Sequence, residues 1–242
     1  MRGNMRRSRE LIDAAFELAA RVGHVPSVAH VEMYRAELSQ IRGEAHETEV
    51  QARRVLELAS EKGIAHYIAW AQMLLGWALV IRGERDSGLA KLEEGLVALR
   101  ATGSQYHIPH RLTVRAQAFL AAQQSMEALS AIEESIESVR RTGEFWYEPE
   151  VLRVKAEILQ SLPQSDVTSA ITCLEQAHDR AHERGARFWE LRAAIALARL
   201  LAQQDRGEAA RRMLTAALDG IGREIGLPEI DQALALLNQL HR

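Results

Sequence analysis

The sequence predicts an all-α fold, a right-handed superhelical solenoid of helix pairs with a period of about 40 residues. Six glycines recur along the 242-residue chain at steps of 40, 40, 40, 42 and 41: Gly23, Gly63, Gly103, Gly143, Gly185 and Gly226. Small residues follow the first five of these by 13 positions: Ala36, Gly76, Ala116, Ala156 and Ala198. The composition, 47% hydrophobic but 5% aromatic, favours closely packed helices over strands.

Apolar residues at helical spacing, with glycine after and proline at the start of several segments, divide the chain into helices. We expect one repeat domain over residues 1–242, with an orphan helix at 9–22 and a capping helix at 228–241. Between them lie five units, at about 25–64, 65–104, 105–144, 145–186 and 187–227. Their paired helices are predicted at 27–42, 45–61, 65–82, 85–101, 107–123, 125–141, 148–162, 166–184, 187–203 and 206–222.

The second helices of the last four units carry a small-large-small pattern that lets two helices approach closely, and the first unit fits it less well, with Thr48/Ala52/Val55. The pattern reads Gly88/Leu92/Gly95, Ala128/Ile132/Ser135, Ala170/Leu174/Ala177 and Ala210/Leu214/Ala217. This spacing resembles the tetratricopeptide repeat (TPR), although the units here are longer. The resemblance implies a protein-binding array with a concave inner surface.

Several adjoining motifs resemble a more specific array. These are Leu75-Gly76-Trp77-Ala78-Leu79, Ala101-Thr102-Gly103, Arg141-Thr142-Gly143-Glu144, the 148–157 stretch and the 188–194 stretch. Over residues 25–242 they are similar to the C-terminal region of bacterial multidomain adenylate cyclase and signalling ATPase proteins. The resemblance implies a regulatory or partner-sensing module. The catalytic residues of that family have no matching positions in this chain.

If the tetratricopeptide register holds, the first helix of each unit turns fixed positions toward the inner surface, and these are the predicted partner-binding residues. They are His30, Met33, Glu37, Trp70, Met73, Trp77, His110, Gln117, Glu150, Arg153, Glu157, Arg192 and Arg199. The arginines favour an acidic peptide or protein segment. Two alternatives stay open: Trp70 and Trp77 as packing residues, and Arg153 and Arg192 as partners of Glu150 and Glu157.

The net charge of the chain and its short motifs exclude several classes of function. A net charge of -3 and a pI near 6.3 do not indicate the basic surface that binds nucleic acid. The single cysteine, Cys173, suits a reducing compartment, and no long apolar stretch predicts a membrane span, so we expect a cytoplasmic location. His178 and His182 have the i, i+4 spacing of zinc ligands, but no third ligand is evident. We therefore expect no cofactor, no metal and no catalysis.

The repeat pattern and the composition predict a non-catalytic protein-binding scaffold, and the resemblance implies that it serves a cyclase- or ATPase-type signalling system. Two other classes remain. One is a small-molecule or metal sensor that uses Trp70, Met73 and Trp77 or the pair His178 and His182. The other is a self-assembling scaffold, with a homodimer through the N-terminal face, because the orphan helix would expose Leu11, Ala15 and Leu18.

Overall fold

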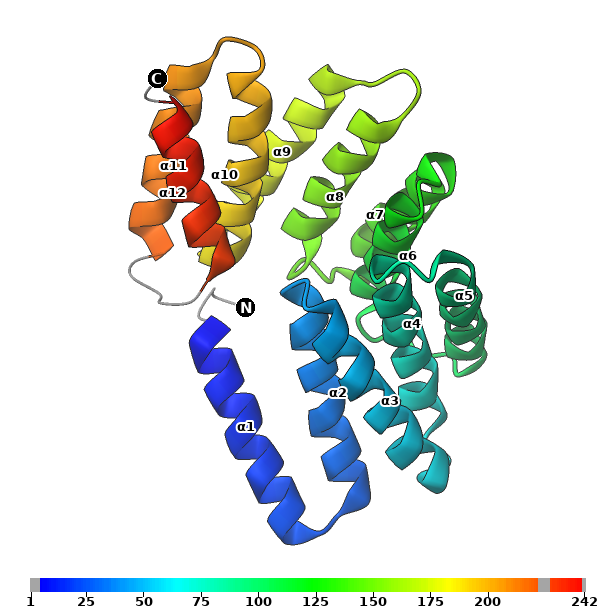
Figure 1. The fold of residues 1–242 in the computed structure, drawn as a ribbon. Helices are drawn as coiled ribbons and strands as arrows, with labels where there is room; N and C mark the ends of the chain where they lie inside the picture. Colours follow the sequence, from blue (N-terminus) through cyan, green and yellow to red (C-terminus); the bar gives the residue numbers. More distant parts are fainter. Residues whose placement is uncertain (1–4, 222–226, 241–242) are drawn as a thin grey trace. The chain divides into compact units, whose positions relative to one another are not determined.

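The computed structural model describes residues 5–221 and 227–240, and in these ranges it contains twelve α-helices that pack pairwise in sequence order (Figure 1). The predicted all-α repeat fold is confirmed. Gly226 and the last residue of the predicted capping helix, 241, lie outside the described residues. The helices are α1 (Met5–Val22), α2 (Val25–Ile41), α3 (Ala45–Lys62), α4 (Ala65–Ile81), α5 (Arg85–Ala101), α6 (Ile108–Ala121), α7 (Ser125–Thr142), α8 (Glu148–Ser161), α9 (Val167–Glu183), α10 (Arg187–Ala202), α11 (Gly207–Ile221) and α12 (Pro228–Leu240).

The chain forms two compact units. Residues 7–131 form the one that we call the N-terminal unit, and residues 5–6 group with 132–221 and 227–240 in the one that we call the C-terminal unit. From Arg7 onward α1 belongs to the N-terminal unit, as do α2 to α6 and the start of α7, and the remainder of α7 through α12 belongs to the C-terminal unit. Across residues 5–221 and 227–240, no helix combines the length and the apolar character that crossing a bilayer requires.

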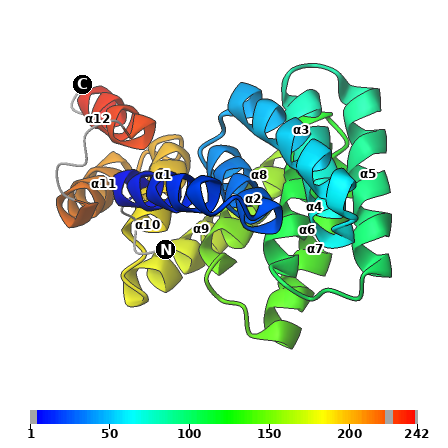
Figure 2. The ribbon, with the colours of Figure 1, turned by 90° about the horizontal axis from the view of Figure 1, so that it is seen from below.

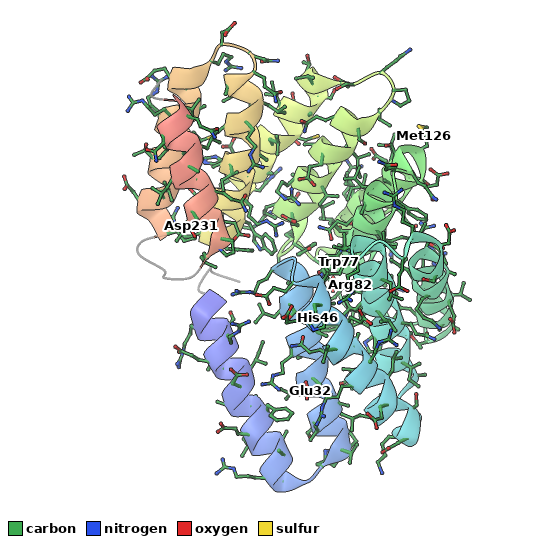
Figure 3. All side chains as sticks on the ribbon, in the orientation of Figure 1. Glu32, His46, Trp77, Arg82, Met126 and Asp231 are labelled. Atoms are coloured by element: carbon green, nitrogen blue, oxygen red, sulfur yellow. The ribbon has the colours of Figure 1, made fainter. Side chains whose placement is uncertain are left out.

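Helix α4 is the centre of the N-terminal unit and packs against α3 and α5 (Figure 2). It buries residues on all of its sides, from Ala69 through Val80, because both neighbours and α6 cover it. The outer helix α3 buries a single stripe: Thr48, Ala52, Val55 and Ala59. A helix that is apolar all round belongs in an interior, whereas a one-sided stripe belongs at the edge of the array. At the C-terminal end of α4, Arg82 lies 2.7 Å from Nδ1 of His46 on α3 (Figure 3).

The C-terminal unit repeats this arrangement around α10, which packs against α9, α11 and α12 (Figure 1). Nearly every position of α10 from Phe188 to Leu201 is buried. Helix α11 again contributes only a stripe, the predicted small-large-small set Ala210, Leu214 and Ala217. Helix α12 closes this core with Ala233 and Leu236.

Small residues bring α4 and α5 into backbone contact. A Cβ placed on Gly76 would lie 2.6 Å from the carbonyl oxygen of Gly88 and from the amide nitrogen of Leu92. A Cβ on Gly95 would likewise lie 2.7 Å from the carbonyl oxygen of Ala69. These glycines are therefore required by the close approach of two helices, as the repeat pattern predicts.

The turns between helices explain why glycines recur with a period of about 40 residues. Gly63 ends α3 with φ +63°, in the left-handed conformation that favours glycine, and its amide is bonded to the carbonyls of Ala59 and Ser60. The other repeating glycines in the described residues share a positive φ. At two internal breaks the chain uses Gln123 and Asp205 in the same conformation.

Candidate functional site

The predicted partner-binding residues divide between the two units. His30, Met33, Glu37, Trp70, Met73, Trp77, His110 and Gln117 belong to the N-terminal unit, and Glu150, Arg153, Glu157, Arg192 and Arg199 to the C-terminal unit. Each set comes from the first helices of successive repeats, so the periodic placement brings distant segments together. The two sets form separate arrangements of side chains, one in each unit.

Most of the predicted residues in the N-terminal unit lie in its interior. Trp70, Met73 and Trp77 are 1%, 0% and 5% exposed and belong to the hydrophobic core, together with Met33. His110 and Glu37 are also buried, whereas Gln117 is half-buried and His30 is exposed. Trp70 and Trp77 are therefore packing residues in this structure, which was the second of the two interpretations that the sequence left open.

Helices α2 and α6 build a buried hydrogen-bonded group that we call the inner polar cluster: Glu37, Gln40, His107, His110 and Gln117. Glu37 Oε1 lies 3.1 Å from His110 Nδ1 and 3.3 Å from His107 Nδ1. His110 Nε2 lies 2.9 Å from Gln40 Oε1, and the Gln40 amide donates to Gln117 Oε1 at 2.9 Å. Side chains from two repeats thus satisfy one another inside the unit, as buried polar groups require.

Aromatic and cationic side chains surround the inner polar cluster. The edge of Trp70 meets His110 with ring centroids 5.3 Å apart, and Tyr106 stacks on His107 at 3.8 Å. The Arg111 guanidinium lies 5.0 Å from the Trp70 ring and within 3.0 Å of His66 Nε2. These contacts hold the two histidine rings in fixed orientations. A space of about 20 Å³ remains between Glu37, Trp70 and Tyr106 and can hold one water molecule.

The charges of the inner polar cluster follow from burial and its partners. Burial raises the pKa of Glu37, but hydrogen bonds from His107 and His110 outweigh it, so the pKa falls below its ordinary value and the carboxylate is ionised. Burial lowers the pKa of His110 against the opposing effect of Glu37. Burial and the charge of Arg111 lower the pKa of His66 to about 4, so this imidazole is neutral near pH 7.

The predicted residues of the C-terminal unit form a charged network. Arg153 of α8 donates two hydrogen bonds to buried Glu150, at 2.7 and 2.8 Å, and a further one to Glu157. Arg192 of α10 approaches Glu150 Oε1 at 3.3 Å and Glu229 at 3.9 Å. Arg153 and Glu150 are almost fully buried, so their pairing is an interior contact rather than a solvated one. Arg199 is exposed and reaches Gln232 at 3.3 Å.

The histidine pair singled out by its spacing lies elsewhere, on α9. The rings of His178 and His182 stack with centroids 6.3 Å apart. His178 Nδ1 faces Asp179 at 3.3 Å, and His182 Nδ1 faces Glu190 at 2.8 Å. Within residues 5–221 and 227–240, the group of at least three metal-ligating side chains with atoms close enough to share an ion is Glu37, His107 and His110.

Sequence reasoning missed several members of this site. His107, Gln40 and Arg111 belong to it, but the predicted inner positions contained only Glu37, His110 and Gln117. The available signal was the i, i+3 pair His107 and His110 at the start of a first helix. It lies two repeats after Glu37, a separation that the array closes because corresponding helices of nearby repeats face the same side.

Comparisons with known proteins place the fold but not a family. No protein-family model matches the sequence. No curated protein matches it either. Among solved structures, the chain is similar to yeast Tom70, with a TM-score of 0.60 and 17% identity over 95% of this chain and 42% of Tom70. It is also similar to the TPR2AB domain of yeast Sti1 in complex with pHSP90, with a TM-score of 0.45 and 13% identity over 96% of this chain and 98% of that one.

The likeness to Tom70 shows the fold, an all-α TPR-like array. The chain spans about two fifths of Tom70, 42% of its length.

Proposed function

We propose that this chain is a non-catalytic protein-binding scaffold that takes an amphipathic helical segment of a partner into an apolar cleft of its N-terminal unit. The observation that carries the proposal is a cleft of about 540 Å³ between α1 and α2, which diverge from their connecting turn (Figure 1). Clefts of this size fall in the range that binds ligands in proteins.

The walls of the cleft are mostly apolar. Its lining residues are Ala15, Leu18, Ala19, Val22, His24, Pro26, Ser27, His30, Val31 and Tyr67. Leu11, Leu18 and Val22 of α1 are 53%, 56% and 69% exposed, and with Ala15 they follow the spacing of one helix face. The apolar faces of α3 and α5 are covered by neighbouring helices, whereas this face of α1 is open. A helix with a matching apolar face would bury it, in the helix-in-groove mode.

Among the predicted partner-binding residues, His30 and Arg199 have the exposure that a partner requires. His30 lines the cleft, and its Nδ1 is hydrogen-bonded to the Tyr67 hydroxyl. Arg199 offers a cation on α10 for an acidic segment. The interior members, such as Trp70 and Arg153, support these surfaces from within.

For the setting, we propose the regulatory array of a bacterial adenylate cyclase- or ATPase-type signalling system, in the cytoplasm. The support is the run of motifs over residues 25–242 and the single cysteine, Cys173. In this setting the chain supplies recognition, and any catalysis belongs to a partner or to another part of the system.

A comparative pull-down tests the proposal. Native chain, a Leu18→Glu/Val22→Glu variant and a Val97→Glu control are used as bait in lysate of the source organism, with capture read by mass spectrometry. Val97 lies on α5 and is 67% exposed, so its substitution places a negative charge at a comparable exposed apolar site outside the cleft, one charge against the two of the cleft variant. We expect the native and control chains to capture the same protein and the cleft variant to lose it. Arg199→Glu tests the acidic-segment component separately.

Solution mass, measured alongside, separates the remaining outcomes. A dimer in the native chain and the control that becomes a monomer in the Leu18→Glu/Val22→Glu variant would show that the cleft holds a second copy of this chain, and the proposal of a different partner would fail. Capture that is unchanged in the cleft variant would remove the cleft from the interface. A native chain that is monomeric and captures nothing would also contradict the proposal.

A further inference from the structure

We propose that Glu37, His107 and His110 form a binding site for a divalent transition-metal ion of the zinc class. In a tetrahedral site with ligand bonds of about 2.0–2.1 Å, adjacent ligand atoms lie about 3.3–3.4 Å apart. Glu37 Oε1 is 3.3 Å from His107 Nδ1 and 3.1 Å from His110 Nδ1, and all three ligand atoms lie within 4.8 Å of one another. Two of the three separations are therefore already close to those that a shared ion demands, and the two histidine nitrogens lie within 4.8 Å of each other.

The chemistry of the ligands selects the class of ion. Two imidazole nitrogens and one carboxylate suit zinc and its first-row neighbours, whereas calcium and magnesium require mainly oxygen ligands. Three protein ligands leave a fourth position for water, as in zinc sites that are not closed. A space of about 20 Å³ on the Glu37 side of the cluster, lined also by Tyr106, has room for one water beside that ligand. The His107 side chain is 18% exposed although its Nδ1 atom is buried, so the cluster lies near the surface of the unit.

Gln40 and Gln117 act as positioning residues. A metal-bound histidine usually donates its other ring N–H to an oxygen acceptor, which fixes both its tautomer and its orientation. His110 has this arrangement: its Nδ1 faces Glu37 while Nε2 faces Gln40 Oε1 at 2.9 Å. Gln40 is held in turn by its hydrogen bond to Gln117. The Trp70 and Tyr106 rings pack on His110 and His107 respectively, so the ligands are restrained before an ion arrives.

One charge acts against a cation here. Arg111 lies near the cluster, but its guanidinium is engaged by His66 at 3.0 Å and packs over Trp70. The Glu37 carboxylate supplies the opposite charge at the ligand atoms themselves. None of the three ligands lines the α1–α2 cleft, so the existence of the site does not depend on the proposed protein-binding function.

The test uses the full chain, first treated with a chelator and then titrated with zinc chloride alone. We expect one zinc ion per chain and a melting temperature that rises with zinc concentration, because an ion that binds the folded state stabilises it. Cobalt(II) in place of zinc should give the visible absorption bands of a tetrahedral site. Glu37→Gln, which keeps the size of the side chain and one acceptor oxygen but removes the charge, should abolish both signals. Gln40→Ala should weaken zinc binding by about 10- to 100-fold.

A His178→Gln/His182→Gln variant is the matched control, because it removes two histidines from another helix. It should retain the zinc-dependent shift and the cobalt spectrum. A native chain with neither signal would overturn the proposal and leave a cluster held by hydrogen bonds alone. Signals that persist in Glu37→Gln but vanish in the control would also overturn it and assign the metal to α9. The cobalt spectrum of the native chain requires no substitution, so a variant that fails to fold cannot obscure the result.

Discussion

Substitution of Gly76 by alanine tests whether backbone contact between α4 and α5 holds the N-terminal unit together. The added Cβ would lie 2.6 Å from two backbone atoms of α5, a shortfall of 0.8 Å against the 3.4 Å at which ordinary contact begins. Backbone atoms cannot rotate away, so the two helices must separate. A gap of this size forfeits about a quarter to a half of the attraction between the atoms that line it.

The expected free-energy change is the difference of two effects. Overpacking of this kind costs about 3 kcal/mol at the upper end of its usual range. Alanine recovers about 1 kcal/mol through its higher helix propensity. The net loss of unfolding free energy is therefore about 2 kcal/mol. Urea unfolding followed by circular dichroism measures it, with an unchanged slope showing that the same surface is exposed in each variant.

Gly220→Ala in α11 is the control for helix propensity. There the three atoms nearest to the added Cβ belong to the flexible side chain of Arg187, the nearest at 3.4 Å, so up to about 1 kcal/mol of stabilisation is expected. Val97→Ala, at an exposed position of α5, is the control within the N-terminal unit. If Gly76→Ala proves as stable as the native chain, α4 and α5 do not depend on the close approach, and the reasoning from the small-residue pattern is wrong.

Two further predictions concern the C-terminal unit. Arg153→Ala should lower the unfolding free energy by about 3 kcal/mol, because it removes two hydrogen bonds from buried Glu150 and leaves Arg192 as a more distant cation. Arg211→Ala, which breaks an exposed pair with Glu208, should change it little, and equal losses in urea titrations would refute the difference. Asp166→Ala should lower the melting temperature, since the Asp166 carboxylate caps α9 at the Ser169 amide, whereas Asp166→Asn should retain most of the cap. That hydrogen bond lowers the pKa of Asp166, so the stability that the cap contributes is present above the unfolded-state pKa and is lost as pH falls through the folded-state pKa. If the melting temperatures of Asp166→Ala and of the native chain fall in parallel over this pH range, the pH dependence of the cap is contradicted.

Local signals in the sequence determined the helices and their order. Gly63 and its equivalents stop helices through a backbone conformation that needs no tertiary contact, and Pro26 or Pro109 starts them for an equally local reason. The period of small residues likewise predicts which helices approach closely. At Gly76, Gly88 and Gly95 the backbone of the facing helix leaves no room for a side chain.

Only the tertiary structure decided which inner positions are surface and which are interior. Trp70 and Met73 have the spacing of a binding face, yet the packing of α2, α4 and α6 encloses them, and that depends on how far successive repeats rotate. The meeting of Glu37 with His107 and His110, the latter 73 residues away, depends on the same rotation. Helix propensity and periodicity act over a few residues, so the sequence by itself determines the repeating elements. The contacts that could hold an ion arise only when several repeats have stacked.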